Sequence, residues 1–147
     1  RQKKQFEDNS VDLIYASHVI EYFDRQQVPI LLCEWRRILR PSGILRIAVP
    51  NFYEIAKLYS DGSHSLDYFI GLMYGRMSMG KEMIYHKTVY DFESLKKVLI
   101  DNEYKNVRYY DWRQTSHSHF DDHSQAYLPH MDKEFGTLMS LNVECEK

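Results

Sequence analysis

The sequence predicts an α/β fold in which parallel strands carry helices on their faces and the last strand runs antiparallel. Two short apolar runs, residues 11–16 and 44–49, flank a helical pattern, and this order is typical of the crossover that joins parallel strands. Near the C-terminus, residues 137–145 alternate between apolar and polar side chains, which indicates an antiparallel strand with one buried face. Together the three segments predict a mixed sheet.

The first strand and the helix after it begin the crossover. Residues 11–16 (VDLIYA) are apolar apart from Asp12, as expected for a strand that is covered on both faces. A short amphipathic turn at residues 19–23 follows, and Asp24 can cap the next helix. Pro29 is compatible with that helix only in its first turn. The apolar side chains that recur at helical spacing are Val28, Leu31, Leu32, Trp35, Ile38 and Leu39.

Turn chemistry at residues 41–43 (PSG) ends the helix, and residues 44–49 form the second buried strand. A helix at residues 52–59 and a short helix at residues 66–73 are expected next. The following stretch is rich in Gly and Met. We expect its methionines to fill irregular gaps in the core, and a mobile lid is the alternative. These methionines are Met73, Met77, Met79 and Met83.

Asp91 caps a further predicted helix, which ends at residues 101–102. Residues 107–112 are expected to form a strand. The segment at residues 113–135 is polar and rich in His and Asp, and its length favours a function over a plain connection. The final strand is predicted to bury Met139, Leu141, Val143 and Cys145 and to expose Ser140, Asn142 and Glu144.

Composition places the chain among globular proteins and excludes several functions. With 147 residues, 44% of them apolar, we expect a single domain over residues 1–147. A net charge of −2 with both signs interspersed provides no basic surface for nucleic acid. No apolar run is long enough to span a membrane. Cys33 and Cys145 have no metal or redox spacing, so we interpret both as reduced core residues of a cytoplasmic protein.

Four motifs carry a family resemblance: FEDNSVD at residues 6–12, SHVIEY at residues 17–22, EWRRILRPSG at residues 34–43 and IAVPN at residues 47–51. In this order they resemble the later half of a class I S-adenosylmethionine-dependent methyltransferase of the small-molecule type 11 group. The usual forms are F-x-D-x-S-F-D, S-x-V-L-E-H and R-x-L-K-P-G-G. The residues that depart mildly from these forms are Val11, Tyr22 and Ser42.

The resemblance implies a partial Rossmann-like methyltransferase sheet. Residues 11–16 and 44–49 would be its fourth and fifth strands, residues 107–112 its sixth, and residues 137–145 its reversed seventh. The resemblance also implies S-adenosylmethionine as the cofactor and a small acceptor, such as a sugar or polysaccharide precursor. The family's glycine-rich donor loop has no counterpart before Val11. We therefore expect the C-terminal portion of such an enzyme, which binds the donor poorly and lacks activity.

Without the first three strands of that sheet, the strand at residues 11–16 would become an apolar edge. Unpaired edge strands are templates for pairing with another chain. We therefore expect a homodimer, or a swapped assembly, through this strand.

Candidate donor-binding residues follow the first strand, because open α/β sheets bind ligands at the carboxyl ends of their strands. By the resemblance, Ala16, Ser17 and His18 would line the methionine part of the donor and the methyl-acceptor side. A histidine that simply caps the next short helix is the alternative for His18.

Other residues are candidates for the acceptor side. Tyr22 stands at the family's usual histidine position, although such tyrosines are often core residues with a bonded hydroxyl. Pro50 and Asn51, at the end of the next strand, are further candidate contacts. His86 is suited to remove a proton from an acceptor hydroxyl, and His18 is the other candidate base. A surface loop histidine is the alternative for His86.

The polar segment also holds a cluster of His and Asp. His117 and His119 are candidate substrate contacts, and with Asp121, Asp122 and His123 they could assemble a zinc or manganese site. The spacing matches no specific metal motif, and the resemblance requires no metal, so we assign none. A substrate loop and a solvated loop are the alternatives.

Three functional hypotheses are open. The leading one is methyl transfer to a small acceptor by in-line displacement, catalysed by proximity and orientation with help from His86 or His18 as base. The second is a non-catalytic binding or assembly module that keeps the α/β core. The third is a metal-dependent hydrolase that uses the His and Asp cluster.

Overall fold

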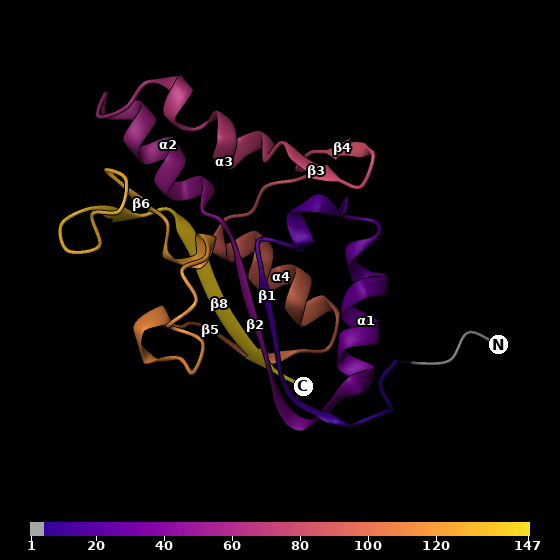
Figure 1. The fold of residues 1–147 in the computed structure, drawn as a ribbon. Coiled ribbons are helices and arrows are strands. Elements are labelled where there is room, and N and C mark those ends of the chain that lie inside the picture. The colour runs from indigo at the N-terminus through magenta and orange to yellow at the C-terminus, as the bar shows by residue number, and fades with distance from the viewer. Residues whose placement is uncertain (1–4) are drawn as a thin grey trace.

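The central sheet of the computed structural model, which describes residues 5–147, has four strands in the order β1-β2-β8-β5 (Figure 1). β1 (Val11–Ser17) and β2 (Leu39–Pro50) are parallel. β8 (Ser140–Glu146) lies antiparallel between β2 and β5 (Lys105–Tyr109). β1, β2 and β5 share one direction, and β8 runs opposite to them. This arrangement confirms the predicted α/β class with an antiparallel C-terminal strand.

The crossover from β1 to β2 runs through the 3-10 helix η1 (Ile20–Tyr22) and the helix α1 (Val28–Ile38). Pro29 lies in the first turn of α1, where an N–H has no helical partner in any case. Cys33 is exposed on the outer side of α1, so the expectation that it is a core residue is wrong. Cys145 is buried on β8 as expected, and both thiols are free.

β2 begins directly after α1, earlier than the sequence indicated. The turn at residues 41–43 is a bulge inside the strand, because the pairing with β1 jumps from Val11–Leu39 to Leu13–Ile44. The backbone enters the left-handed region in this bulge, at φ 63°. The predicted turn therefore exists, but it interrupts a strand instead of separating a helix from a strand.

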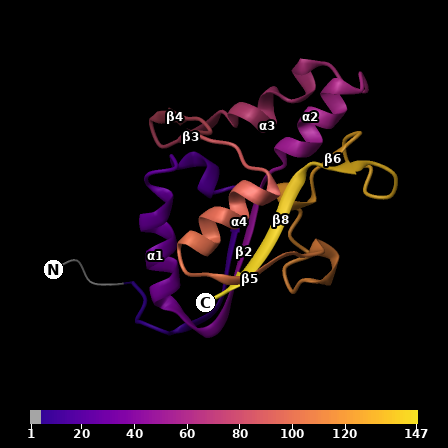
Figure 2. The ribbon, with the colours of Figure 1, turned by 180° about the vertical axis from the view of Figure 1, so that it is seen from behind.

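Helices α1 and α4 (Phe92–Asp101) cover one face of the sheet, and Figure 2 shows α4 across β2 and β8 in the view from behind. The predicted cap of α4 is confirmed: Asp91 Oδ1 accepts the N–H of Ser94 at 2.8 Å, and the Ser94 hydroxyl accepts the N–H of Asp91 at 3.1 Å. The core between these helices and the sheet includes Val28, Leu32, Leu45, Ile47, Val49, Leu95, Leu99, Leu141, Val143 and Cys145.

The polar segment after β5 covers the opposite face of the sheet, so β8 is buried on both sides. Ser140 and Asn142 are each 3% exposed, although the alternation predicted that they face solvent. Asn142 Nδ2 donates to the Ser124 carbonyl at 2.9 Å, and the Tyr15 hydroxyl donates to Asp122 Oδ2 at 2.6 Å. The half-buried interpretation of the last strand is wrong, because these distant residues supply a cover that local alternation cannot reveal.

A second layer lies over the carboxyl ends of β1 and β2 (Figure 1). It consists of α2 (Phe52–Ser60), the 3-10 helix η2 (Leu66–Tyr68), α3 (Ile70–Tyr74) and a hairpin of β3 (Met77–Met79) and β4 (Glu82–Ile84). The predicted helices are confirmed, whereas the hairpin was not expected. A small core joins this layer to the residue before β8 and consists of Ile55, Leu58, Phe69 and Met139.

The methionines of this layer do not fill core gaps as expected. Met77, Met79 and Met83 lie on the hairpin and are 41%, 60% and 39% exposed. Met73 is the exception, since it packs against the small core of the second layer. The Met-rich stretch is therefore a largely exposed apolar flap at one end of the sheet.

The remaining elements are short. η3 (Trp112–Gln114) and η4 (His123–Gln125) are 3-10 turns in the polar segment, and β6 (Tyr127–Leu128) pairs with β7 (Thr137–Leu138). The strand expected at residues 107–112 ends earlier, because Asp111 caps η3. Across residues 5–147, no helix has the length and apolar character needed to cross a bilayer.

Candidate functional site

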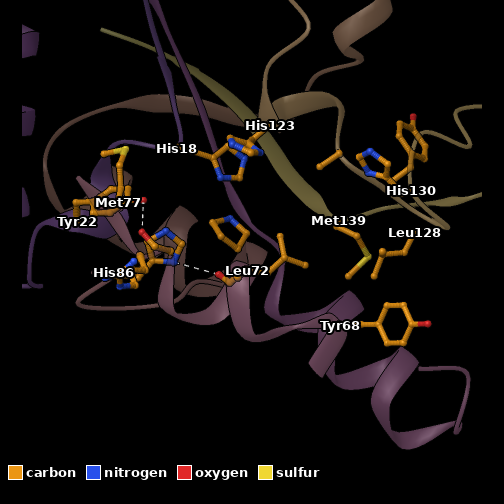
Figure 3. Close-up of a pocket in the computed structure, with 16 residues that line it drawn as sticks. His18, Tyr22, Tyr68, Leu72, Met77, His86, His123, Leu128, His130 and Met139 are labelled. Atoms are coloured by element: carbon orange, nitrogen blue, oxygen red, sulfur yellow. Dashed lines mark hydrogen bonds between the residues drawn. The ribbon is translucent and has the colours of Figure 1, made fainter. Parts of the chain in front are cut away.

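A cavity of about 510 Å³ lies where the carboxyl ends of β1 and β2 meet α3, the hairpin and the segment around β6 (Figure 3). This volume is in the range of small-molecule sites, which usually lie at such strand ends in open α/β sheets. Its lining includes His18, Tyr22, Tyr68, Leu72, Arg76, Met77, His86, His123, Leu128, His130 and Met139.

His18 follows β1 directly and marks the point where the chain leaves the sheet. Its backbone lies in the left-handed region at φ 54°, a conformation that costs energy for a residue with a Cβ. The backbone N–H donates to the Ala48 carbonyl at 2.7 Å, which holds the turn against β2. The imidazole consequently faces the cavity wall next to His123, at 5.5 Å between ring centroids.

A chain of hydrogen bonds fixes the proton on His18. Asn142 Nδ2 donates to the Ser124 carbonyl at 2.9 Å, so Oδ1 of the same side chain is the atom that faces Ser140. The Ser140 hydroxyl donates to this Oδ1 at 2.7 Å, and its oxygen must therefore accept from His18 Nε2 at 3.1 Å. His18 is the Nε2–H tautomer, and its lone pair lies on Nδ1.

Glu21 lies behind His18 and is fully buried. Among the described residues, neither carboxyl oxygen has a hydrogen-bond partner, and Oε2 is 3.8 Å from His18 Nδ1. Burial raises the pKa of Glu21 to about 8, and burial with the neighbouring histidines lowers the pKa of His18 to about 3. Burial therefore favours the neutral form of both side chains at neutral pH.

His86 comes from the loop after β4 and packs edge-on against Tyr22, with ring centroids 4.7 Å apart. Nδ1 of His86 donates to the Leu72 carbonyl at 3.0 Å, shown as a dashed line in Figure 3, so Nε2 carries the lone pair. Burial lowers the pKa of His86, so this lone pair is free of a proton at neutral pH. The Tyr22 hydroxyl donates to the Gly75 carbonyl at 2.7 Å.

Gly75 makes room for His86. Its φ is +52°, and a Cβ at this position would lie 1.9 Å from His86 Nε2. Only glycine therefore permits both the left-handed turn after α3 and the position of the imidazole. This glycine links the end of α3 to the placement of the candidate base.

The structure brings some of the sequence-derived candidates together. His18, Tyr22, Pro50 and His86 all line the cavity. The sequence did not lead us to Glu21. A carboxylate within the otherwise apolar short turn at residues 19–23 is the signal that could have found it. The residues missed as cavity contacts include Tyr68, Arg76, His123 and His130, which adjoin the cavity only through tertiary packing.

Other candidates lie outside the cavity. Ala16 is buried within β1 and pairs with Ile47, and Ser17 is the last residue of that strand. Asn51 caps α2, and its side chain accepts the N–H of Tyr53 at 3.2 Å. None of these three side chains is among the described residues that line the cavity.

His117 and His119 also lie away from the cavity. The His117 ring stacks on Tyr15 with centroids 3.7 Å apart, and its Nε2 is 3.4 Å from Arg46 Nη1. His119 packs on Phe120 near the surface. Within residues 5–147, no group of three or more His, Cys, Asp or Glu side chains is arranged to hold a metal ion. The hydrolase hypothesis therefore gains no support from the geometry.

The order of strands, with a reversed strand between β2 and β5 and a cavity at the carboxyl ends of β1 and β2, is that of the later half of a class I methyltransferase sheet. A family model described as "Methyltransferase domain" matches residues 2–47 of the chain. This match covers the motifs at residues 6–12 and 17–22 and confirms the resemblance to class I S-adenosylmethionine-dependent methyltransferases.

Solved structures of methyltransferases share the fold. A SAM-dependent methyltransferase from Methanosarcina mazei superposes with a TM-score of 0.55 and 15% identity over 99% of this chain and 63% of its own. A SAM-dependent methyltransferase from Archaeoglobus fulgidus superposes with a TM-score of 0.53 and 17% identity over 98% of this chain and 62% of its own. Burkholderia thailandensis 1,6-didemethyltoxoflavin-N1-methyltransferase, with bound 1,6-didemethyltoxoflavin and S-adenosylhomocysteine, superposes with a TM-score of 0.51 and 10% identity over 98% of this chain and 47% of its own.

At these identities the similarity establishes the fold only. The chain spans less than two thirds of the length of each of these structures. No curated protein sequence matches the chain significantly.

Proposed function

We propose that this chain forms the acceptor side of an S-adenosylmethionine-dependent methyltransferase that acts on a small molecule. The observation that carries the proposal is the histidine-lined cavity at the carboxyl ends of β1 and β2, in a chain whose motifs match a methyltransferase domain. Ligands of open α/β sheets bind at this edge. A single domain over residues 1–147 in the cytoplasm is part of the same proposal.

The residues present fit one end of the donor. The chain leaves β1 after Ser17, at His18 next to the cavity, where the methyl-bearing end of the donor would meet an acceptor. Of the side chains that line the cavity in the described part of the chain, none is a carboxylate that could bind ribose hydroxyls. We therefore propose that the nucleoside is held by residues outside this chain, and that the chain by itself binds the donor weakly and is inactive.

When bound, the donor would supply an electrophilic methyl group, and this chain would orient the acceptor and remove its proton. His86 is the stronger candidate base, because its Nε2 lone pair is not engaged by Leu72. In His18, Nε2–H is bonded to Ser140 and Nδ1 faces Glu21, so we propose that His18 orients the acceptor. Tyr22 would hold the His86 ring in place.

A non-catalytic binding module that keeps the α/β core and its cavity is the second candidate. For either function we propose a homodimer through the outer edge of β1. The family resemblance implies a sugar or polysaccharide precursor as the acceptor, and the chemistry of the cavity wall, argued below, favours a different class.

Titration of the chain with S-adenosylhomocysteine, followed by NMR and calorimetry, tests the proposal. We expect millimolar binding that shifts the backbone signals of Ala16, Ser17 and His18, while adenosine, which lacks the amino-acid arm, leaves them unchanged. Absence of these shifts would overturn the methyltransferase assignment and favour the binding module. Micromolar affinity would overturn both the binding module and the proposal that donor-binding residues lie outside the chain.

A further inference from the structure

We propose that the acceptor in this cavity is a planar aromatic acid that carries a phenolic hydroxyl. This inference rests on the proposed methyl transfer and names the acceptor class. It comes from the chemistry of the cavity wall, from the polar atoms that remain available there, and from one cation at its rim that has no ion-pair partner among residues 5–147.

The wall of the cavity is made mainly of rings and apolar side chains. Seven of the described lining residues carry planar rings, four of them histidines and three tyrosines, and the others are mostly aliphatic residues, glycine or methionine. No Asp, Glu, Asn or Gln side chain lines it in the part of the chain that the structure describes. A buried polyol needs hydrogen bonds for each hydroxyl, and unpaired hydroxyls are costly, so this wall disfavours a sugar and favours a flat apolar ring.

Several polar groups in the wall are already engaged. The Tyr22 hydroxyl donates to the Gly75 carbonyl at 2.7 Å, and the Tyr127 hydroxyl accepts from Trp112 Nε1 at 3.1 Å. His86 Nε2 remains available as an acceptor. A ligand with one hydroxyl that donates to His86 Nε2 therefore suits this site better than a polyol, whose hydroxyls each need donors and acceptors.

Arg76 supplies a cation at the rim. Its side chain is exposed, and it makes no ion pair with any residue in the described range. A guanidinium binds a carboxylate through two parallel hydrogen bonds, whereas burial lowers the pKa values of His18 and His86 and so disfavours their cationic forms. An acidic substituent on the ring would therefore be oriented by Arg76.

The phenolic hydroxyl is the group that suits His86. A phenol has a pKa of about 10, close enough to imidazole for proton transfer during the reaction, whereas an alcohol is far weaker as an acid. His86 Nε2 takes the hydroxyl proton as the oxygen–carbon bond forms and the donor's sulfur–carbon bond breaks. The imidazole of His86 would then carry a positive charge, and the sulfonium of the donor would become a neutral thioether.

Three probes separate the ring from its substituents. In NMR titrations of the whole chain, 4-hydroxybenzoate is the expected ligand, 4-hydroxycyclohexanecarboxylate has the same substituents on a puckered ring, and glucuronate is hydroxyl-rich with the same carboxylate. We expect 4-hydroxybenzoate to shift the ring signals of His86 and Tyr68 and to bind at least about tenfold more tightly than the other two. Equal or tighter binding of glucuronate would overturn the proposal.

An arginine pair tests the role of the carboxylate. We expect Arg76→Gln to weaken 4-hydroxybenzoate about tenfold and to leave the uncharged 4-hydroxybenzyl alcohol unchanged. Arg40→Gln is the charge-matched control, because Arg40 pairs with Asp12 at the far end of β1. Equal effects of the two variants would contradict the proposed contact. If S-adenosylhomocysteine shifts Ala16 and Ser17 but 4-hydroxybenzoate shifts nothing, the acceptor class is wrong while the methyltransferase proposal stands.

Discussion

Glu21 and His18 form a buried neutral pair whose two pKa values are displaced in opposite directions. Burial raises the pKa of Glu21 from 4.5 to about 8, so folding binds a proton and stability falls as pH rises through this interval. Burial lowers the pKa of His18 from 6.5 to about 3, so stability rises with pH across that lower interval. The two effects oppose each other between pH 4.5 and 6.5, and only Glu21 acts above this window.

Glu21→Gln should therefore remove a pH dependence. Between pH 6.5 and 8 the native chain should lose up to about 1.4 kcal/mol of unfolding free energy per pH unit, because the buried carboxyl must ionise. The amide of Gln has nearly the same size and shape but does not titrate, so the variant should show a flat profile. Urea unfolding at both pH values measures this. Glu93→Gln, on the exposed side of α4, should keep the native slope, and equal slopes for the native chain and Glu21→Gln would contradict the prediction.

His117 is a residue that the sequence assigned to substrate and the structure places in a packed wall. Its ring is 7% exposed and stacks on Tyr15 of β1, so it attaches the polar segment to the sheet. His117→Ala should lower the unfolding free energy by about 1–2 kcal/mol, since aromatic stacking and buried area are lost. Binding of 4-hydroxybenzoate should not change. His119→Ala is the exposed control, and weaker ligand binding without a loss of stability in His117→Ala would restore the substrate role.

At the scale of elements, the end of α3 decides where His86 lies. Gly75→Ala should distort the cavity, because the new Cβ would lie 1.9 Å from His86 Nε2 and φ is +52°. Gly80→Ala is a matched control with φ +62° and no atom within 4 Å of the Cβ. We expect about 1 kcal/mol of lost stability from the left-handed backbone in Gly80→Ala, and at least twice that in Gly75→Ala. Equal losses in urea unfolding, with an unshifted His86 NMR signal in Gly75→Ala, would contradict this role for Gly75.

The elements that the sequence predicted correctly are those whose signals are local. The helix α4 was found from Asp91 and its apolar face, and β1 from a continuous apolar run. The hairpin of β3 and β4 was missed, because Met has no strong strand preference and both strands are exposed. The two-sided burial of β8 was missed for a different reason, since the cover comes from residues far away in sequence.

At the scale of the whole molecule, the cavity unites segments that the sequence separates widely. The strand ends around His18 and Pro50 were expected there, because parallel strands bring their carboxyl ends to one edge. His123 and His130 reach the same cavity only because the polar segment folds back over the sheet. Motif spacing can predict the first kind of contact, while the second depends on tertiary packing that leaves no periodic signal.

The outer edge of β1 offers the last test at this scale. Among the described residues β1 pairs only with β2, and the strand is largely apolar, so its outer backbone groups can pair with a second copy. We expect sedimentation equilibrium at micromolar concentration to give twice the chain mass of 17.7 kDa. Val11→Lys places a charge on this edge and should shift the equilibrium toward monomer, because two copies would bring like charges together. Ile100→Lys, on α4, should leave the dimer intact. A monomeric mass for the native chain would contradict edge pairing, because the outer edge of β1 would then be stable without a partner strand.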